Sequence, residues 1–420
     1  MSKIVSKSVK KTAKSAQECI NMVIAQSGGP SMVINDSLCG ALMAGRSARK
    51  AGKIGKILGA KHGVEGILKG DYIDLTELKD KAIKRLLATP SSALGSCRHK
   101  PDAKDCRKIF EEFRRLKVGF FFYIGGNDSA DAARIVAEEA EKENYPLVVY
   151  HIPKTIDNDL RSCDHTPGYA SAANFVIRAL IGDDLDNRAL GGVKIDVIMG
   201  RDAGFLTASS ALARVRPDCG PHLIYLPEVP FSEEKFVKDV KAVLKKYNRC
   251  VVAVSEGIRG KDGIPIGAKL GTGEKDSHGN VQMSGSGALG DHLAKVLKEK
   301  AAVKRVRADT FGYLQRSFPS LQTSQDMAEA AGVGFFAVNY ALAAAAGVKG
   351  SIKKGTVGIL RKKGKTYKVD YKALPIQDAA KETRAFPKEF IAKGGNDVTK
   401  AFVDYLKPLI DDLPEIEILL

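Results

Sequence analysis

The most informative stretch of this sequence is VGFFFYIGGNDSADAARIVAEEAEKENYPLVVYHI, residues 118–152. Two runs of β-branched and aromatic residues, VGFFFYI and PLVVYHI, flank a segment in which apolar residues recur at helical spacing and glutamates occupy the other face. The pattern predicts a strand, a tight glycine turn, a helix and a second strand. Such units build parallel sheets.

The same alternation continues on both sides of this stretch. MVIAQ and KIGKILGA precede it, and VKIDVIMG, HLIYLPEV and CVVAVSEG follow it, each leading into a loop or helix. We therefore predict an α/β fold made of two Rossmann-like domains with mainly parallel sheets. Ligands of open α/β sheets bind beyond the carboxyl ends of the strands, so the active site is expected in the cleft between the domains.

A soft boundary near residue 165 divides the chain, without a long linker. We predict a flexible basic tail at 1–18, a first domain at 19–165 to which part of 314–370 returns, a second domain at 166–313, and a C-terminal segment at 371–420 that packs on the domains.

The net charge of +17 points to an anionic partner, which the charge alone leaves open between nucleic acid, an acidic membrane surface and small phosphorylated molecules. Basic residues are spread along the chain rather than gathered with aromatics, which argues against nucleic acid. Residues 330–348 are apolar but rich in Ala and Gly around Asn339, which favours a core helix over a membrane span.

Cysteine usage and the N-terminus bear on the compartment. The seven cysteines are widely spaced and form no C-x-x-C pair, as expected for reduced thiols. The first eighteen residues carry five lysines and no apolar region, so they do not resemble a secretory signal. We expect a cytoplasmic protein.

Two glycine turns follow predicted strands. Ser27-Gly28-Gly29-Pro30 comes after MVIAQ, and Gly125-Gly126-Asn127-Asp128-Ser129 comes after VGFFFYI, each just before a helix. Glycine admits strained backbone angles, and a helix N-terminus attracts anions. Both turns are therefore expected at one phosphate-binding crevice.

The loop Pro153–Asp159, PKTIDND, places Lys154, Asp157 and Asp159 close together after a buried strand. Phosphoryl transfer needs a carboxylate to take the acceptor's proton, cations to neutralise the donor, and usually Mg²⁺. The loop offers both kinds of group. An ordinary turn whose side chains bond their own backbone would use the same residues, and spacing alone leaves both interpretations open.

Eight ordered motifs give the chain a resemblance to the phosphofructokinase family over roughly residues 20 to 330. They are SGG at 27–29, GSCR at 95–98, GGNDS at 125–129, PKTIDND at 153–159, MGR at 199–201, PEVPF at 227–231, SEG at 255–257 and YLQR at 313–316. The resemblance implies transfer of a phosphoryl group to the C1 hydroxyl of fructose 6-phosphate, with 19–165 as the donor domain and 166–313 as the sugar domain.

Roles follow from the resemblance residue by residue. Asp157 would be the general base and Arg201 would stabilise the transferring group. The sugar phosphate would be held by Thr155, Asp159, Met199, Gly200, Glu256, Tyr313 and Arg316, and the donor by Gly28, Gly29, Arg98, Gly126, Asn127 and Ser129. Arg307 matches an arginine that in the family reaches a neighbouring subunit's sugar phosphate, which implies a homo-oligomer, either a dimer or a tetramer.

The choice of donor depends on two positions. ATP-using relatives keep glycine where this chain has Asp128 and Lys154, and side chains there occupy room that a nucleotide needs. The pair resembles the pyrophosphate-dependent branch, with Lys154 neutralising pyrophosphate and Asp128 working with Lys154 or with Mg²⁺ held by Asp128 and Asn127. We therefore expect pyrophosphate and fructose 6-phosphate as substrates and Mg²⁺ as cofactor.

Three departures from the family pattern leave details open. Asn127 stands where many relatives have a metal-binding aspartate, and Tyr313 stands where ATP-using bacterial relatives have histidine. No arginine precedes Met199 at the expected position, and Lys194 lies out of register.

Three other functions were weighed. An ATP-dependent 6-phosphofructokinase would share the sugar site, a dinucleotide-binding oxidoreductase would need a G-x-G-x-x-G that is missing, and a nucleic-acid-binding module would leave the carboxylate loop unexplained. Sedoheptulose 7-phosphate presents a similar hydroxyl and stays open as a second sugar.

Overall fold

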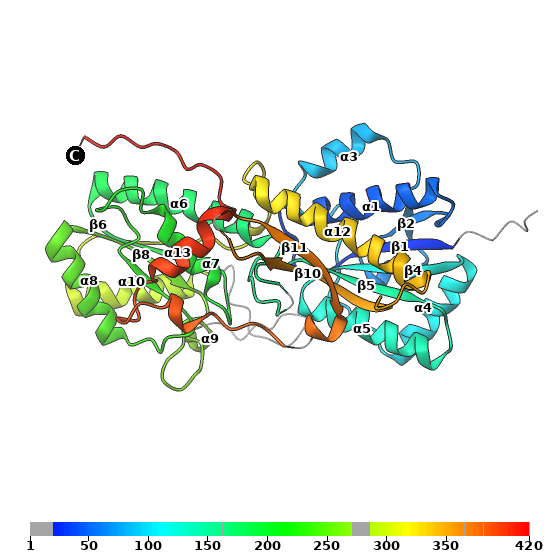
Figure 1. Cartoon of the computed structure of the whole chain (residues 1–420). Coiled ribbons are helices and arrows are strands. Elements are labelled where there is room, and N and C mark those ends of the chain that lie inside the picture. Colours follow the sequence, from blue (N-terminus) through cyan, green and yellow to red (C-terminus); the bar gives the residue numbers. More distant parts are fainter. Residues whose placement is uncertain (1–19, 162, 271–285, 365, 381, 420) are drawn as a thin grey trace, which may run out of the picture.

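The computed structural model describes residues 20–161, 163–270, 286–364, 366–380 and 382–419. The basic tail predicted at 1–18 lies outside these residues. The chain forms two lobes, each built on its own sheet (Figure 1).

The first sheet has the strand order β11-β10-β5-β4-β1-β2-β3 within the described residues. Its strands are β1 Asn21–Gln26, β2 Ile57–Ala60, β3 Tyr72–Asp74, β4 Val118–Gly125, β5 Val148–Pro153, β10 Lys354–Arg361 and β11 Val369–Pro375. The inner strands are parallel to one another, and β3 and β11 pair antiparallel at the two edges.

Both faces of this sheet are buried, which explains the unbroken apolar run of β4. Phe120 and Phe122 point into the core on one side, whereas Phe121 and Tyr123 point into the core on the other. Helices α1 Ile34–Lys50 and α12 Ser324–Ala345 contribute to the first core, and α4 Ala103–Arg115 and α5 Asn127–Lys142 contribute to the second. Two short helices, α2 Val64–Lys69 and α3 Asp80–Leu87, complete this lobe.

The second sheet is parallel throughout, in the order β7-β8-β6-β9. It consists of β6 Gly192–Ile198, β7 Leu223–Tyr225, β8 Arg249–Ser255 and β9 Val306–Thr310. Val193, Ile195 and Val197 of β6 pack with Phe236 and Leu293. The helices of this lobe are α6 Tyr169–Leu190, α7 Phe205–Ser209, α8 Glu233–Tyr247, α9 Ile266–Leu270, α10 Ala288–Ala301 and α11 Leu314–Ser317.

After the second lobe the chain returns to the first. α12 packs along α1, and β10 and β11 extend the first sheet beyond β5. The last helix, α13 Lys400–Leu406, lies over the second lobe, where Phe402 and Leu406 enter the core with Phe205 (Figure 1). The predicted fold class, mixed α/β with mostly parallel sheets, is confirmed.

One helix among the described residues, α12, is long and apolar enough to cross a bilayer by length and composition. Its inner side is buried: Val333, Ala337 and Ala341 pack in one core of the first sheet, and Ala330 packs in the core that continues into the second lobe. The helix thus has the packing of a core element.

Candidate active site

A cavity of about 480 Å³ lies beyond the carboxyl ends of β1, β4 and β5. Its walls come from the turn 27–30, residues 97–100, the start of α5 and the loop 154–157. Met199 and Arg316 close it from the side of the second lobe. The cavity therefore joins groups from both lobes, as expected for a ligand site in an open α/β protein.

The first glycine turn presses its backbone against two cations. Gly28 has a φ of +74°, and a Cβ at this residue would lie 3.4 Å from the Lys154 Nζ. A Cβ at Gly29 would lie 3.1 Å from the Arg316 Nη1, and the Lys154 Nζ donates a hydrogen bond to the Gly29 carbonyl at 2.5 Å. A side chain at Gly28 would be strained by its positive φ, and one at Gly29 would crowd the guanidinium of Arg316.

The second glycine turn is tied to the first. The hydroxyls of Ser27 and Ser129 share a hydrogen bond, and a Cβ at Gly125 would lie 2.1 Å from the Ser129 Oγ. Behind the turn, the buried His151 donates from Nε2 to the Gly125 carbonyl at 2.8 Å. Its Nδ1 lies 2.9 Å from the Thr356 hydroxyl of β10, which fixes the floor of the cavity to a third strand.

Helix α5 begins at this turn, with Gly126 as its N-cap residue and Asn127 and Asp128 in its first turn. The unpaired amides and the helix dipole at such an N-terminus favour an anion. Asp128 is exposed and lines the cavity with Asn127. The side-chain oxygens of these two residues are ligands that suit a hard cation such as Mg²⁺.

Lys154 is almost completely buried, with 3% of its surface exposed. Burial, and after it the positive charge of Arg316, lowers the pKa of Lys154 to about 7. A polyanion in the cavity would favour the protonated form. Lys154 is therefore a cation whose charge depends on the ligand beside it.

The loop after Lys154 holds two carboxylates whose ionised forms are disfavoured. Burial raises the pKa of Asp157 above its ordinary value, although Lys154 and Arg201 oppose the shift. Burial, together with the neighbouring Asp157, raises the pKa of Asp159 to about 7. A carboxylate whose pKa is raised by burial is suited to proton transfer.

The second lobe supplies a backbone loop after β6. The Gly200 amide donates to the Glu256 Oε1 at 3.5 Å, and the Ser255 hydroxyl donates to the Gly200 carbonyl at 2.6 Å. The Met199 amide donates to the Gln315 Oε1 at 3.3 Å, which connects this loop to α11. Arg316, also in α11, stacks over the Tyr313 ring at 4.5 Å, and burial lowers its pKa.

The structure places most of the predicted site residues at this cavity. Those that line it are Gly28, Gly29, Arg98, Gly126, Asn127, Asp128, Ser129, Lys154, Thr155, Asp157, Met199 and Arg316. Tyr313 stacks against the lining residue Arg316, and Gly200, next to Met199, is hydrogen-bonded to Glu256. Arg201 and Asp159 interact with Asp157 through their charges. Arg307 is elsewhere, exposed on β9, with its guanidinium donating to the Val306 carbonyl at 3.1 Å.

Sequence reasoning missed several neighbours of the site. Lys100 lines the cavity and pairs with Asp131, and Asp202 raises the pKa of Asp157. Asp202 directly follows the MGR motif, so its position next to that motif could have predicted that it lies near the site. The Ser27–Ser129 bond joins residues 102 positions apart and left no local pattern to read.

The family model for phosphofructokinase, described as "Phosphofructokinase", matches residues 21–341. The chain belongs to the phosphofructokinase family. The resemblance deduced from the eight motifs is thereby confirmed, and the matched range contains every predicted site residue.

Several relatives of this phosphofructokinase share one name. The chain is 51% identical to pyrophosphate–fructose 6-phosphate 1-phosphotransferase of Rhodospirillum rubrum, over 93% of this chain and 94% of the relative. It is 35% identical to the protein of the same name from Halomonas elongata, over 94% of each chain. A crystal structure of pyrophosphate-dependent phosphofructokinase from Nitrosospira multiformis, 30% identical, aligns with a TM-score of 0.81 over 97% of this chain and 95% of that one.

Proposed function

We propose that this chain transfers a phosphoryl group from pyrophosphate to the C1 hydroxyl of fructose 6-phosphate, giving fructose 1,6-bisphosphate and phosphate in a reversible reaction. The observation that supports this best is the position of Lys154, whose ammonium lies in the cavity wall against the Gly29 carbonyl. Its charge suits a compact polyanion, and Asp128 at the opposite turn takes space that a nucleotide would need.

We assign the chemistry to the loop between the lobes. Asp157 takes the proton of the C1 hydroxyl, and Arg201 and Lys154 oppose the negative charge that develops on the transferring group. Arg316, with Tyr313, Met199, Gly200, Glu256, Thr155 and Asp159, holds the sugar phosphate. The donor contacts Gly28, Gly29, Arg98, Gly126, Asn127 and Ser129, so the first lobe serves the donor and the second serves the sugar.

Phosphotransferases generally use a divalent metal. In this chain the carboxylate of Asp128 and the amide oxygen of Asn127 offer hard oxygen ligands at the cavity wall, so they would hold Mg²⁺. When bound there, the ion would neutralise part of the charge of the donor phosphates.

The oligomeric state and the cellular location are also proposals. An exposed Arg307 outside the cavity is available to a neighbouring subunit, which supports a homo-oligomer. The described cysteines Cys39, Cys97, Cys106, Cys163, Cys219 and Cys250 are buried and form no disulfide with one another, which supports a cytoplasmic location.

A paired assay tests the donor. Formation of fructose 1,6-bisphosphate is measured with Mg²⁺ and either pyrophosphate or ATP as sole donor, in the wild-type chain and in Lys154→Gly and Asp128→Gly variants. We expect turnover with pyrophosphate, little with ATP, and a loss of pyrophosphate activity in Lys154→Gly. A wild-type preference for ATP would overturn the donor assignment, whereas inactivity with both donors would overturn the function.

A further inference from the structure

The loop that carries the two site carboxylates is held from outside the family-matched range. Residues 382–384 come from the C-terminal segment, and Thr383 forms an antiparallel bridge with Leu160. The Arg384 amide donates to the Asp159 carbonyl at 2.6 Å. The C-terminal segment thus adds a short strand contact directly beside Asp159.

The side chain of Arg384 holds the same loop at two further points. Its Nη2 donates to the Asn158 carbonyl at 2.7 Å, and its Nη1 donates to the Asp164 carbonyl at 2.6 Å. Together with its amide, Arg384 therefore bonds the carbonyls of three loop residues. A planar guanidinium with several donors in fixed directions is suited to such a brace, and lysine is not.

Asn158, between the two carboxylates, has a left-handed backbone conformation that few residues other than glycine and asparagine adopt readily. Its φ is +59°, in the left-handed region, and its side chain is fully buried. The Asn158 Nδ2 donates to the Tyr405 hydroxyl at 2.8 Å, and that hydroxyl donates to the Asp164 carbonyl at 2.7 Å. A second C-terminal residue therefore fixes the same two loop positions as Arg384.

Arg384 also contacts the lobe that carries Arg201. Its guanidinium carbon lies 4.7 Å from the centre of the Phe205 ring, at the start of α7. Phe205 follows Arg201 by only four residues, at the end of the loop that carries Arg201. One side chain therefore contacts both the loop of Asp157 and the helix that follows the loop of Arg201.

We propose that Arg384 is a positioning residue for phosphoryl transfer, which fixes the backbone around Asp159 and spaces the Asp157 loop from the Arg201 loop. This inference rests on the proposed function. It assigns a role in the reaction to the segment 371–420, which the sequence motifs left without one.

The charge of Arg384 acts on the same loop. Asp159 faces Asp157, Arg384 and Asp202, and Arg384 is the cation among them that favours its ionised form. Because two interacting carboxylates lose their protons as a pair, removing this cation should move the acid limb of the kcat profile to higher pH. A residue that only stabilises the fold would leave that limb in place.

The test compares three variants of the loop brace with a matched control. Arg384→Met removes the fork and the charge, Arg384→Lys keeps the charge, and Tyr405→Phe removes one hydroxyl but keeps the ring. The control is Arg214→Met, because Arg214 also anchors the C-terminal segment, through a fork on Asp397 at 2.9 and 3.1 Å, without contacting the catalytic loop. Each protein is assayed for kcat, KM, the pH profile and thermal stability, with whichever donor the wild-type chain uses.

We expect Arg384→Met to lower kcat about 100-fold, with KM for the donor little changed, because misplaced reacting groups cost about that much. Its acid limb should move to higher pH. Arg384→Lys should have the acid limb of the wild-type chain but a lowered kcat. Tyr405→Phe should lower kcat without moving the acid limb. Arg214→Met should lower thermal stability alone.

Two results would overturn the inference while leaving the proposed function intact. One is a wild-type kcat in Arg384→Met; the other is the same kcat and pH profile in Arg384→Met and Arg214→Met. If Arg384→Met fails to fold, an unchanged kcat in both Arg384→Lys and Tyr405→Phe has the same meaning. A wild-type chain that is inactive with both donors would overturn the function and this inference together.

Discussion

Lys154 is an ammonium group held where water hardly reaches it, with its pKa lowered to about 7. Above that pH the ligand-free protein has mostly neutral Lys154. A pyrophosphate anion in the cavity restores the charge, because the ion pair favours the protonated form. Binding of the donor is therefore coupled to binding of a proton.

The expected consequence is that pyrophosphate binding weakens as the pH rises above about 7, and that the wild-type chain takes up more protons on binding than Lys154→Arg does. Isothermal titration calorimetry in two buffers with different ionisation enthalpies measures the proton count. The arginine variant stays charged throughout, so it subtracts the protons of pyrophosphate itself. Equal proton uptake in the two proteins would contradict the role of Lys154.

For Asp157 we predict a loss confined to the chemical step. Asp157→Asn should lower kcat by about 10²- to 10⁴-fold, the usual contribution of a general base, with KM for fructose 6-phosphate little changed. Steady-state kinetics with the sugar varied measures both. The prediction fails if the variant keeps more than about a tenth of wild-type kcat, since a general base contributes more than that.

Asp202→Asn is the matched control, because Asp202 neighbours Asp157 by charge but lies outside the cavity lining. Asp202 raises the pKa of Asp157, so its removal should lower that pKa. The acid limb of the kcat profile should then move to lower pH while turnover at neutral pH persists.

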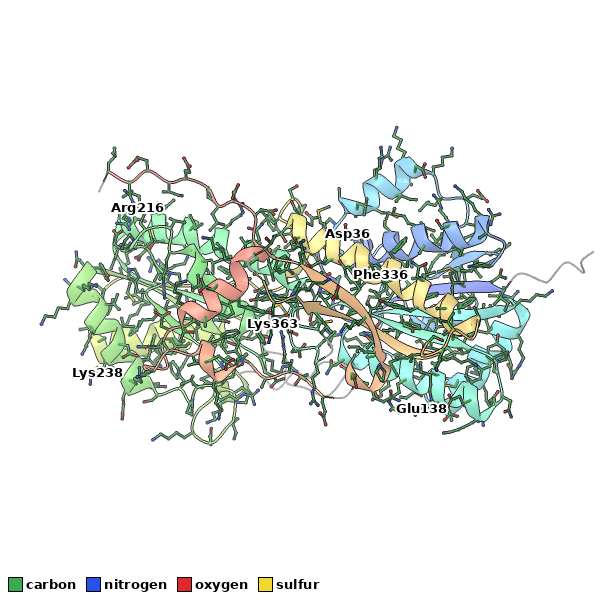
Figure 2. All side chains as sticks on the ribbon, viewed as in Figure 1. Asp36, Glu138, Arg216, Lys238, Phe336 and Lys363 are labelled. Atoms are coloured by element: carbon green, nitrogen blue, oxygen red, sulfur yellow. The ribbon has the colours of Figure 1, made fainter. Side chains whose placement is uncertain are left out.

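At the scale of elements, the first lobe depends on an unusually close pair of helices. A Cβ at Gly40 in α1 would lie 1.9 Å from the Ala331 carbonyl, and a Cβ at Gly334 in α12 would lie 2.0 Å from the Ser37 carbonyl. Asp36 and Phe336 mark these two helices in Figure 2. In each helix, a glycine therefore lets the backbone of the other helix pack directly against it.

Gly40→Ala should lower the free energy of unfolding by about 1–3 kcal/mol, the usual cost of an overpacked core. The control is Gly182→Ala in α6, where a Cβ would meet nothing within 4 Å. That variant should be stabilised by about 0.5–1 kcal/mol, because alanine is the better helix former. Denaturant unfolding of both variants measures the change in the free energy of unfolding. Equal changes in the two variants would show that the close contact between α1 and α12 does not determine the stability of the first lobe.

Helix α12 also connects the two lobes. Asp326, near the start of α12, accepts hydrogen bonds from the amides of Gly168 and Ser171 at 2.9 Å each, at the start of α6. α12 thus packs on the first lobe while its first turn caps the principal helix of the second. The relative position of the two halves of the cavity depends on this joint.

Features that depend on neighbouring residues in the sequence could be predicted, whereas contacts between residues far apart in the sequence could not. The strands and turns around Gly28 and Gly126 were predictable, because apolar runs and glycine turns are local patterns. The cap on α6 by Asp326 and the brace by Arg384 were not. Each joins positions more than 150 residues apart, and no motif in the sequence marks such a contact.

At the scale of the whole molecule, Arg307 is exposed on β9, away from the cavity of its own chain. If it completes the site of a neighbouring subunit, a mixture of Asp157→Asn and Arg307→Ala chains should regain activity. In a dimer, random mixing makes half of the molecules hybrids with one complete site of two, so about a quarter of wild-type activity is expected.

The experiment mixes the two inactive variants, dissociates and reassociates them, and measures turnover and mass. Each variant treated alone in the same way is the control. If each site used Asp157 and Arg307 of the same chain, every site in the mixture would carry one of the two substitutions. Failure to regain activity would therefore mean that Arg307 acts in its own chain or in no site.

The return of the chain to its first lobe has a consequence for biosynthesis. β10 and β11 belong to the first sheet, and Phe402 and Leu406 belong to the core of the second lobe, yet all of them leave the ribosome after β9. Domains usually form one after another as the polypeptide emerges, the N-terminal one first. A nascent chain that stops before residue 354 therefore exposes two unfinished cores. One that stops between residues 375 and 402 still lacks Phe402 and Leu406, so the second lobe is completed after the first and its core is open to aggregation for longer.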